Sequence, residues 1–263
     1  MPYRYETHLH TSQASACGSS KGSEHARFYK EMGYQGIIVT DHFFGGNTCI
    51  PERLPWKKRV ERFCSGYEDA LIMGQKIGLD VFFAWEQRFA VDEYLVYGLS
   101  PEWLLQHPEV ERWNRREQLE GVHRYGGCVI QAHPFRDRDY IDKICLAPQF
   151  SDGIEVANAG NFDYNDAYAL RYAQEYNLLT IAGSDNHNSA YWKRYPKGLM
   201  GIETEEPIRD MQQFAQMLLS RKGFTPIIPE GRFDVQPKDI PELFTYWYND
   251  KERAVPTNRK WFE

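Results

Sequence analysis

The chain lacks the features that would take it into or across a membrane. Its apolar runs, such as Gly36–Val39 and Val81–Ala84, are strand-sized, whereas a spanning helix needs about 20 apolar residues. The N-terminus, MPYRYETHLHT, contains no apolar stretch of the kind that a secretory signal peptide carries. We therefore expect no membrane partner.

The chain also lacks any closely spaced pair of cysteines. Its five cysteines are scattered singly and are odd in number. They stand at positions 17, 49, 64, 128 and 145. Because a disulfide framework or a zinc ribbon needs paired cysteines, this pattern predicts reduced thiols in a cytoplasmic protein.

No long basic run, internal repeat or Pro/Ser-rich linker is present, and the net charge is −6. Duplex nucleic acid, whose binding depends on neutralised phosphates, is therefore not an expected partner. A single basic pocket for one phosphate stays possible, since net charge says little about one cleft. The length of 263 residues suits one domain at 1–228, followed by a proline- and aromatic-rich extension at 229–263 that packs on it.

What the chain does contain is an alternation of short apolar runs with longer amphipathic ones. The predicted strands are Tyr3–His10, Gly36–Asp41, Asp80–Phe89, Tyr94–Leu99, Cys128–His133, Gly153–Ala157 and Leu178–Asp185. The predicted helices are Ser23–Met32, Lys57–Ile77, Glu109–Tyr125, Tyr164–Tyr176 and Ile208–Arg221. Such alternation indicates an α/β fold with a mostly parallel sheet. The pattern alone leaves a closed barrel and an open, doubly wound sheet both possible.

Five of the predicted strands end in residues that bind metals. These residues are His8 and His10, the pair Asp41–His42, Glu86, His133, and the pair Asp185 and His187. In a barrel of parallel strands these ends meet on one face, where active sites form. Alternation along a strand also sends His8 and His10 to the same side, so that one metal can bind both imidazoles. Zn²⁺, Mn²⁺ and Fe²⁺ accept such a set of ligands.

Each of these features has an ordinary structural explanation when taken alone. Asp41 could cap the following helix, and Pro134 could simply turn the chain after His133. Glu86 could be a paired structural carboxylate. Together, however, five strand ends that all finish in metal-binding residue types are not explained by caps and turns, and they favour a metal-dependent barrel enzyme.

The segments that carry these residues resemble the PHP (polymerase and histidinol phosphatase) family of metal-dependent phosphoesterases. They are His8-Leu-His10-Thr11, Thr40-Asp-His42, Trp85-Glu86, Ala132-His133-Pro134, Ile154-Glu155-Val156 and Gly183-Ser-Asp185-Asn-His187, and they follow one another in the family's order. The resemblance implies a distorted, TIM-like (β/α)₇ barrel with two or three divalent metal ions. By motif, His8, His10, Glu86 and Asp185 would bind one metal, and Glu86 would bridge to a second metal on His133. His42 and His187 would serve a third.

The sequence departs from the family pattern at two positions. Many members have a histidine ligand of the second metal where this chain has Glu93, in Glu93-Tyr-Leu-Val-Tyr-Gly98, so Glu93 becomes a candidate ligand. Many members also have Ser-Asp-Gly or a histidine shortly after the first motif. Here that stretch offers only Cys17.

Metal-assisted attack of water on a phosphoester needs no protein nucleophile. Asp185 and His187 are the candidate catalytic residues, together with Asp41, which could orient His42 or cap a helix. Arg136 and Asn158 are the candidate substrate-binding residues, since a guanidinium suits a phosphate. The expected substrate is a small phosphorylated molecule or a short oligonucleotide.

Two other functions remain open. An amidohydrolase-type enzyme also places a His-x-His motif on the first strand of a metal barrel, although Glu86 on the third strand and the Asp185–His187 pair fit that scheme poorly. A non-catalytic, metal-binding regulatory module is the second. The near-complete set of ligands argues against it.

Overall fold

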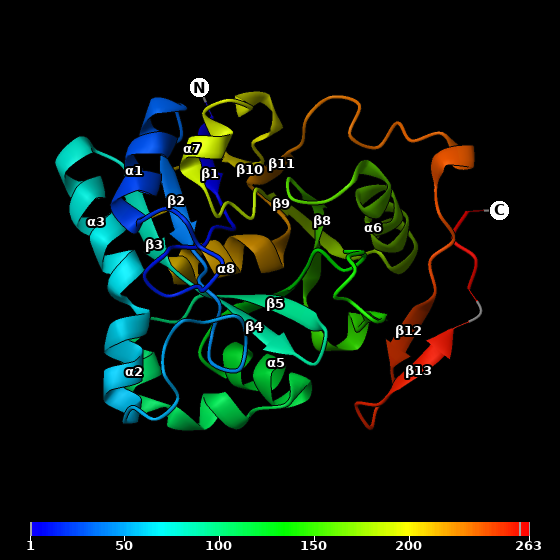
Figure 1. The fold of residues 1–263 in the computed structure, drawn as a ribbon, viewed down its shortest axis with the longest axis horizontal. Helices are drawn as coiled ribbons and strands as arrows, with labels where there is room; N and C mark the ends of the chain where they lie inside the picture. Colours follow the sequence, from blue (N-terminus) through cyan, green and yellow to red (C-terminus); the bar gives the residue numbers. More distant parts are fainter. Residues whose placement is uncertain (1, 258, 263) are drawn as a thin grey trace.

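The computed structural model describes residues 2–257 and 259–262 and shows a mixed α/β fold (Figure 1). The strands are β1 (Tyr3–Glu6), β2 (Gly36–Val39), β3 (Asp80–Phe83), β4 (Trp85–Phe89), β5 (Asp92–Tyr97), β6 (Cys128–Ala132), β7 (Ile144–Leu146), β8 (Gly153–Asn158), β9 (Leu179–Gly183), β10 (Gly201–Thr204), β11 (Phe224–Ile227), β12 (Thr245–Tyr248) and β13 (Ala254–Thr257). The α-helices are α1 (Gly22–Glu31), α2 (Trp56–Phe63), α3 (Ser65–Ile77), α4 (Pro101–Gln106), α5 (Arg115–Arg124), α6 (Asp163–Tyr176), α7 (Ser189–Trp192) and α8 (Met211–Ser220). Four 3₁₀ turns complete the described secondary structure, at Pro108–Arg112, Pro148–Phe150, Pro196–Gly198 and Pro237–Asp239. No described helix is long and apolar enough to cross a membrane.

The described strands form three sheets. Two have five strands, in the orders β11-β10-β1-β2-β3 and β4-β5-β6-β8-β9, and the third is β13-β12-β7. The two large sheets meet at isolated bridges, Leu9 with Asn186 and His42 with Glu86. Within the described residues, therefore, no continuous ladder closes the seven-stranded barrel that the family resemblance implies, although the predicted α/β class is confirmed.

The expectation of a mostly parallel sheet is wrong. β4 and β5 are joined by only Ala90 and Val91 and pair antiparallel, as so short a connection requires. β5 also pairs antiparallel with β6, and β10 and β11 add antiparallel strands beside β1. The sequence pattern showed apolar runs here but not the reversal between them.

The helices pack against the sheets. α1 packs on β2 and α3 packs on β3, α6 lies on β8, and α8 crosses β5 and β6. The predicted helix 57–77 is interrupted at Cys64, which ends α2 and begins α3. Buried aromatic side chains fill one of the hydrophobic cores, among them Phe43, Phe63 and Trp85.

The C-terminal part of the chain lies against the opposite edge from α1 and α3 (Figure 1). β12 pairs with β7 through Thr245 and Ile144, and Trp261 packs among the core residues Phe135 and Tyr172. These contacts show a packed segment. The division into a domain at 1–228 and an extension at 229–263 stays a prediction.

Candidate metal centre

The predicted ligands come from different strand ends and meet in one buried cluster. His8 and His10 follow β1, His42 follows β2, Glu86 lies on β4, Glu93 lies on β5, His133 follows β6, and Asp185 and His187 follow β9. Apart from the partly exposed Glu93 and His187, these side chains are buried. All eight predicted metal-binding residues are thus close together.

His8 and His10 point to the same side, as strand alternation predicts. Their Nε2 atoms are 3.1 Å apart, and Asp185 Oδ1 lies 3.1 Å from His10 Nε2 and 3.5 Å from His8 Nε2. The backbone amides of this region hold the geometry, since His10 N donates to Asn186 O and Asn186 N donates to His8 O. Three ligand atoms therefore converge on one point.

Glu86 lies at the centre of the cluster. Its Oε1 atom is 3.2 Å from His133 Nε2 and 3.3 Å from His8 Nε2. Its Oε2 atom is 2.7 Å from His42 Nδ1 and 3.5 Å from His10 Nε2. Each carboxylate oxygen thus faces a different pair of imidazoles, which is the geometry of a bridging ligand.

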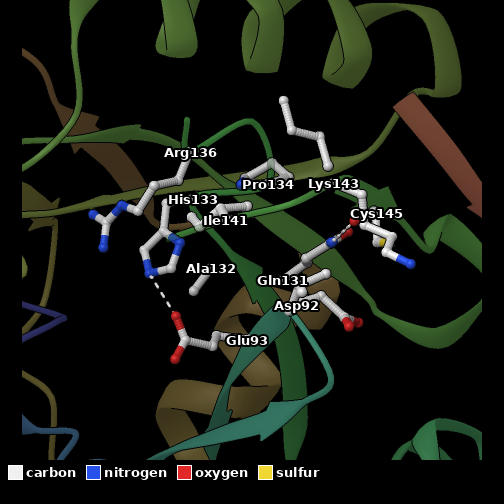
Figure 2. A pocket seen from close by; sticks show the side chains of 12 residues that line it. Asp92, Glu93, Gln131, Ala132, His133, Pro134, Arg136, Ile141, Lys143 and Cys145 are labelled. Atoms are coloured by element: carbon white, nitrogen blue, oxygen red, sulfur yellow. Dashed lines mark hydrogen bonds and ion pairs between the residues drawn. The ribbon is translucent and has the colours of Figure 1, made fainter. Parts of the chain in front are cut away.

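Glu93 occupies the place between His42 and His133. Its Oε1 atom is 3.9 Å from His42 Nδ1. Its Oε2 atom is 3.7 Å from His133 Nε2, the contact that Figure 2 shows. Together with Arg136, Glu93 and His133 line a small pocket that opens beside the cluster (Figure 2).

Among the residues that the structure describes, four overlapping groups of side chains have ligand atoms close enough to share an ion. They are His8, His10 and Asp185; His8, Glu86 and His133; His42, Glu86 and Glu93; and His10, His42 and His187. Two buried polar atoms of the cluster, His42 Nδ1 and Glu86 Oε2, form no hydrogen bond of good geometry. They lie 2.7 Å from each other. Buried polar atoms without partners are costly, so these residues fit a bound cation.

Two of the cluster residues have strained backbones. His133 has φ 27° and Asp185 has φ 49°, a region that residues with a β-carbon rarely adopt. His133 directly follows β6, and Asp185 lies two residues after the end of β9. The side chains of both residues contribute to the cluster. Strain of this kind is typical of functional sites.

The charges of the cluster strongly perturb its pKa values. Burial opposes protonation of His8, but the carboxylates of Glu155, Asp185 and Glu86 outweigh it and raise the His8 pKa well above its usual value. Burial, with His42 and His187 nearby, lowers the pKa of His10 well below the usual range. The pKa values of the two imidazoles are shifted in opposite directions because their neighbours differ.

The carboxylates are perturbed in the same way. Burial opposes ionisation of Asp185, yet Arg136 and His8 hold its pKa well below the usual value. Burial and the neighbouring Glu86 carboxylate raise the pKa of Glu93.

A second layer of polar residues fixes the histidines. Glu155 accepts a hydrogen bond from His8 Nδ1 at 3.0 Å and from the His133 backbone amide at 3.1 Å. His10 Nδ1 lies 3.2 Å from Ser15 Oγ, which itself donates to Asp41 Oδ1 at 2.7 Å. The Asp41 carboxylate accepts hydrogen bonds from Thr11 and Ser15, so Asp41 supports the loop around the histidines.

Arg136 and Asn158, the predicted substrate-binding residues, lie side by side. Arg136 Nη2 is 2.8 Å from Asn158 Oδ1 and 2.7 Å from Asp185 Oδ2. Arg136 Nε also donates to Asn161 Oδ1 at 3.0 Å. A guanidinium is therefore held directly against the cluster.

Cys17, whose role the sequence left open, lies near His42 and His187 of the group His10, His42 and His187. The Cys17 side chain is exposed, and the imidazoles of His187 and His42 are near enough to interact with its thiol. Burial of part of the side chain raises the pKa of the thiol, but the two histidines outweigh it and lower the pKa to about 6.

Sequence reasoning missed several supporting residues. Glu6 is fully buried and accepts hydrogen bonds from the amides of His8 and Ser184 and from Tyr29 Oη. Its position two residues before the first histidine was the available signal. Ser15 and Asn161 carried no signal, since single polar residues in loops are common.

Comparison with solved structures shows proteins whose fold is similar to that of this chain. No family model matches the sequence, and no curated protein matches it. A two-domain protein from Bacteroides vulgatus, described as containing a predicted PHP-like metal-dependent phosphoesterase, has a TM-score of 0.62 at 17% identity; the match covers 88% of this chain and 66% of that one. This chain has the fold of PHP-like proteins. Its sequence resemblance to the PHP family is confirmed at that level.

Two further structures share the fold. PsfC from Pseudomonas syringae has a TM-score of 0.58 at 17% identity, with 89% of this chain and 94% of that chain covered. An amidohydrolase from Chromobacterium violaceum has a TM-score of 0.50 at 12% identity, with 86% and 98% covered. Because one similar structure is described as a phosphoesterase and another as an amidohydrolase, the fold alone does not separate the two activities.

Proposed function

We propose that this protein is a metal-dependent phosphoesterase that uses two or three divalent ions of zinc, manganese or iron. The observation that carries the proposal is the cluster itself. Eight histidine and carboxylate side chains from different strand ends face one another at short distances, with the guanidinium of Arg136 against one of them. Burying several ionisable side chains together costs free energy, and bound metal ions would offset that cost.

The overlapping groups support a division of the ligands among the ions. His8, His10, Asp185 and Glu86 would hold one ion, and Glu86, His133 and Glu93 a second. His42 and His187 would serve a third, with His10 and Cys17 close by. When bound, such ions lower the pKa of a coordinated water and neutralise charge on a phosphate.

The protein's own groups bind and orient the substrate. Arg136 presents a planar guanidinium whose donors match phosphate oxygens. Asn158 Oδ1 accepts a hydrogen bond from its Nη2 atom and helps to hold it in place. Asp185 and His187 are the proposed catalytic residues, placed to hold a proton near the reacting phosphate. Asp41 we assign to positioning, through Ser15 and Thr11.

The substrate we propose is a small phosphorylated molecule or a short oligonucleotide. We also infer that the two large sheets are halves of one distorted barrel, which the bridges of Leu9 with Asn186 and His42 with Glu86 support. Their strand ends would then form one active-site face.

The test is turnover of a panel containing a phosphomonoester, a phosphodiester, a dinucleotide and an amide, with Mn²⁺, Zn²⁺ and Fe²⁺ supplied separately. We expect phosphoester hydrolysis that His8→Ala and Glu86→Ala abolish together with metal binding. His123→Ala, which removes a more exposed histidine bonded to Asp152, is the matched control.

Three results would count against the proposal. Amide hydrolysis without phosphoester hydrolysis would favour the amidohydrolase alternative. Stoichiometric metal without any turnover would favour a regulatory module. Unchanged metal content and turnover in both ligand variants would remove the site altogether.

A further inference from the structure

Arg232 is a largely buried arginine in the segment that follows β11. Its side chain is 13% exposed, although most arginines lie in solvent. Nη2 donates to the backbone carbonyl oxygens of Asn158 and Asn161 at 2.9 Å each, and Nε donates to Asp166 Oδ2 at 2.7 Å. Nη1 donates to the exposed Asp163. These acceptors belong to the last residue of β8, to the turn that follows it or to α6.

Asp166 holds the same turn from the other side. It is fully buried, and its Oδ2 atom accepts from the amide of Asn158 at 3.1 Å. Its Oδ1 atom accepts from the side-chain amide of Asn161 at 2.9 Å. Arg232 and Asp166 together fix both ends of the turn from Asn158 to Asn161.

The turn presents two side-chain oxygens to Arg136. Asn158 Oδ1 accepts from Nη2 at 2.8 Å, and Asn161 Oδ1 accepts from Nε at 3.0 Å. A long side chain held at two donors keeps fewer rotamers, so less entropy is lost when it binds an anion. The orientation of Arg136 therefore depends on the turn.

We propose that Arg232 is a positioning residue for phosphate binding, which acts through the turn Asn158–Asn161 to aim Arg136 at the cluster. The inference rests on the proposed function, in which Arg136 binds the phosphate. It also gives the C-terminal segment a part in the active site. Without Arg232, two carbonyl oxygens and a buried carboxylate lose a charged donor, and the turn loses the bonds that hold it in place.

The experiment measures the binding of inorganic phosphate to the metal-loaded full chain by calorimetric titration. We expect Arg232→Met to raise the dissociation constant of phosphate about tenfold, the loss expected from a displaced guanidinium contact. Metal content is measured on the same samples and should not change. Because binding is measured instead of turnover, failure of the proposed hydrolysis would be seen separately.

Arg259→Met is the matched control. Arg259 lies in the same C-terminal segment, forms an ion pair with Glu175 and stacks on Trp261, but touches no residue of the turn. We expect this variant to bind phosphate like the wild type. An equal loss of phosphate binding in both variants would show a general effect of the segment and overturn the proposal.

A double-mutant cycle separates positioning from structural damage. In an Arg136→Met background, Arg232→Met should cause no further loss, since the residue through which it acts is gone. Additive losses, or absence of phosphate binding in the wild type, would overturn the inference. If Arg232→Met does not fold, Arg232→Lys is tested instead, since lysine keeps the positive charge but lacks the planar guanidinium. A loss of phosphate binding in that variant supports the proposal, and wild-type binding contradicts it.

Discussion

The Nε2 atoms of His8 and His10 face each other at 3.1 Å, although two imidazole lone pairs at that distance repel. His8 Nδ1 is bonded to Glu155, and His10 Nδ1 contacts Ser15 Oγ, whose own proton goes to Asp41. Both Nδ1 atoms are thus fixed as donors. A proton on His8 Nε2, consistent with the raised pKa of His8, occupies the position that a metal ion would take.

This relationship predicts that metal binding releases protons. Near pH 7 the metal-free protein should carry the extra proton on His8, because its pKa is well above the usual value, and a metal ion must displace it. The measurement is the heat of metal binding in two buffers that differ in ionisation enthalpy. His123→Ala should release the same number of protons as the wild type, and identical heats in both buffers would contradict the prediction.

Glu6 predicts a pH dependence of stability. Burial raises its pKa from 4.5 to about 7, against hydrogen bonds from Ser184, Tyr29 and His8 that lower it. Since the folded pKa lies above the unfolded one, the native state binds this proton more tightly, and the free energy of unfolding should fall as pH rises from about 4.5 to 7. The full contribution is on the order of 3 kcal/mol.

Chemical denaturation of the metal-free protein at pH 5 and pH 8 measures this effect. Glu6→Gln cannot titrate, so its stability should change less between the two pH values than that of the wild type. Equal changes in both proteins would assign the pH dependence to other groups.

We expect Glu93 to influence which metal binds at the proposed second site, which it would form with Glu86 and His133. Glu93→Gln should weaken binding at that site at least about tenfold, because the amide is a poorer ligand than the carboxylate. Glu93→His should shift preference from Mn²⁺ toward Zn²⁺, since imidazole suits the softer ion. Metal analysis after loading with equal amounts of both ions checks this. Glu109→Gln, an exposed glutamate bonded to His107, should keep the wild-type ratio.

Cys17 and Cys49 are both exposed, but their thiols differ. The histidines beside Cys17 lower its pKa to about 6 against the effect of burial, whereas burial raises the pKa of Cys49. In the metal-free protein at pH 7, a disulfide reagent should therefore react faster with Cys17. Metal loading should slow this reaction, because it engages His42 and His187. Rates in the Cys17→Ala and Cys49→Ala variants separate the two thiols, and faster reaction at Cys49 would contradict the argument.

The strand ends were predictable because each apolar run stops where a polar ligand begins. The predicted strands Gly36–Asp41 and Cys128–His133 begin where the observed strands β2 and β6 begin, but β2 ends two residues earlier than predicted and β6 one residue earlier. The hairpin between β4 and β5 and the break at Cys64 were not predictable, since apolar residues continue across both. β12 depends on its pairing with β7, and such a distant partner leaves no local pattern. The contacts of Arg232 were not predictable from the sequence either, because the residues that accept its hydrogen bonds are distant from it in the chain.

A buried ion pair ties the C-terminal hairpin to the strand that carries Glu93. Arg115 donates to both carboxylate oxygens of Asp92, at 2.8 and 2.6 Å, and also to Tyr248 Oη at 2.7 Å. The Arg115 and Asp92 side chains are only 8% and 2% exposed. Arg115→Met should therefore destabilise the protein by about 3–5 kcal/mol, because it leaves the Asp92 carboxylate buried without its charge partner.

Urea denaturation measures this loss, with Arg116→Met as the matched control at an exposed neighbouring position. That control should change stability by less than about 0.5 kcal/mol. The double variant Asp92→Asn, Arg115→Met should recover part of the loss, because no unpaired charge remains in the interior. A double variant as unstable as Arg115→Met alone would show that packing of the guanidinium over the Tyr248 ring, 3.7 Å from its centre, provides the stability instead.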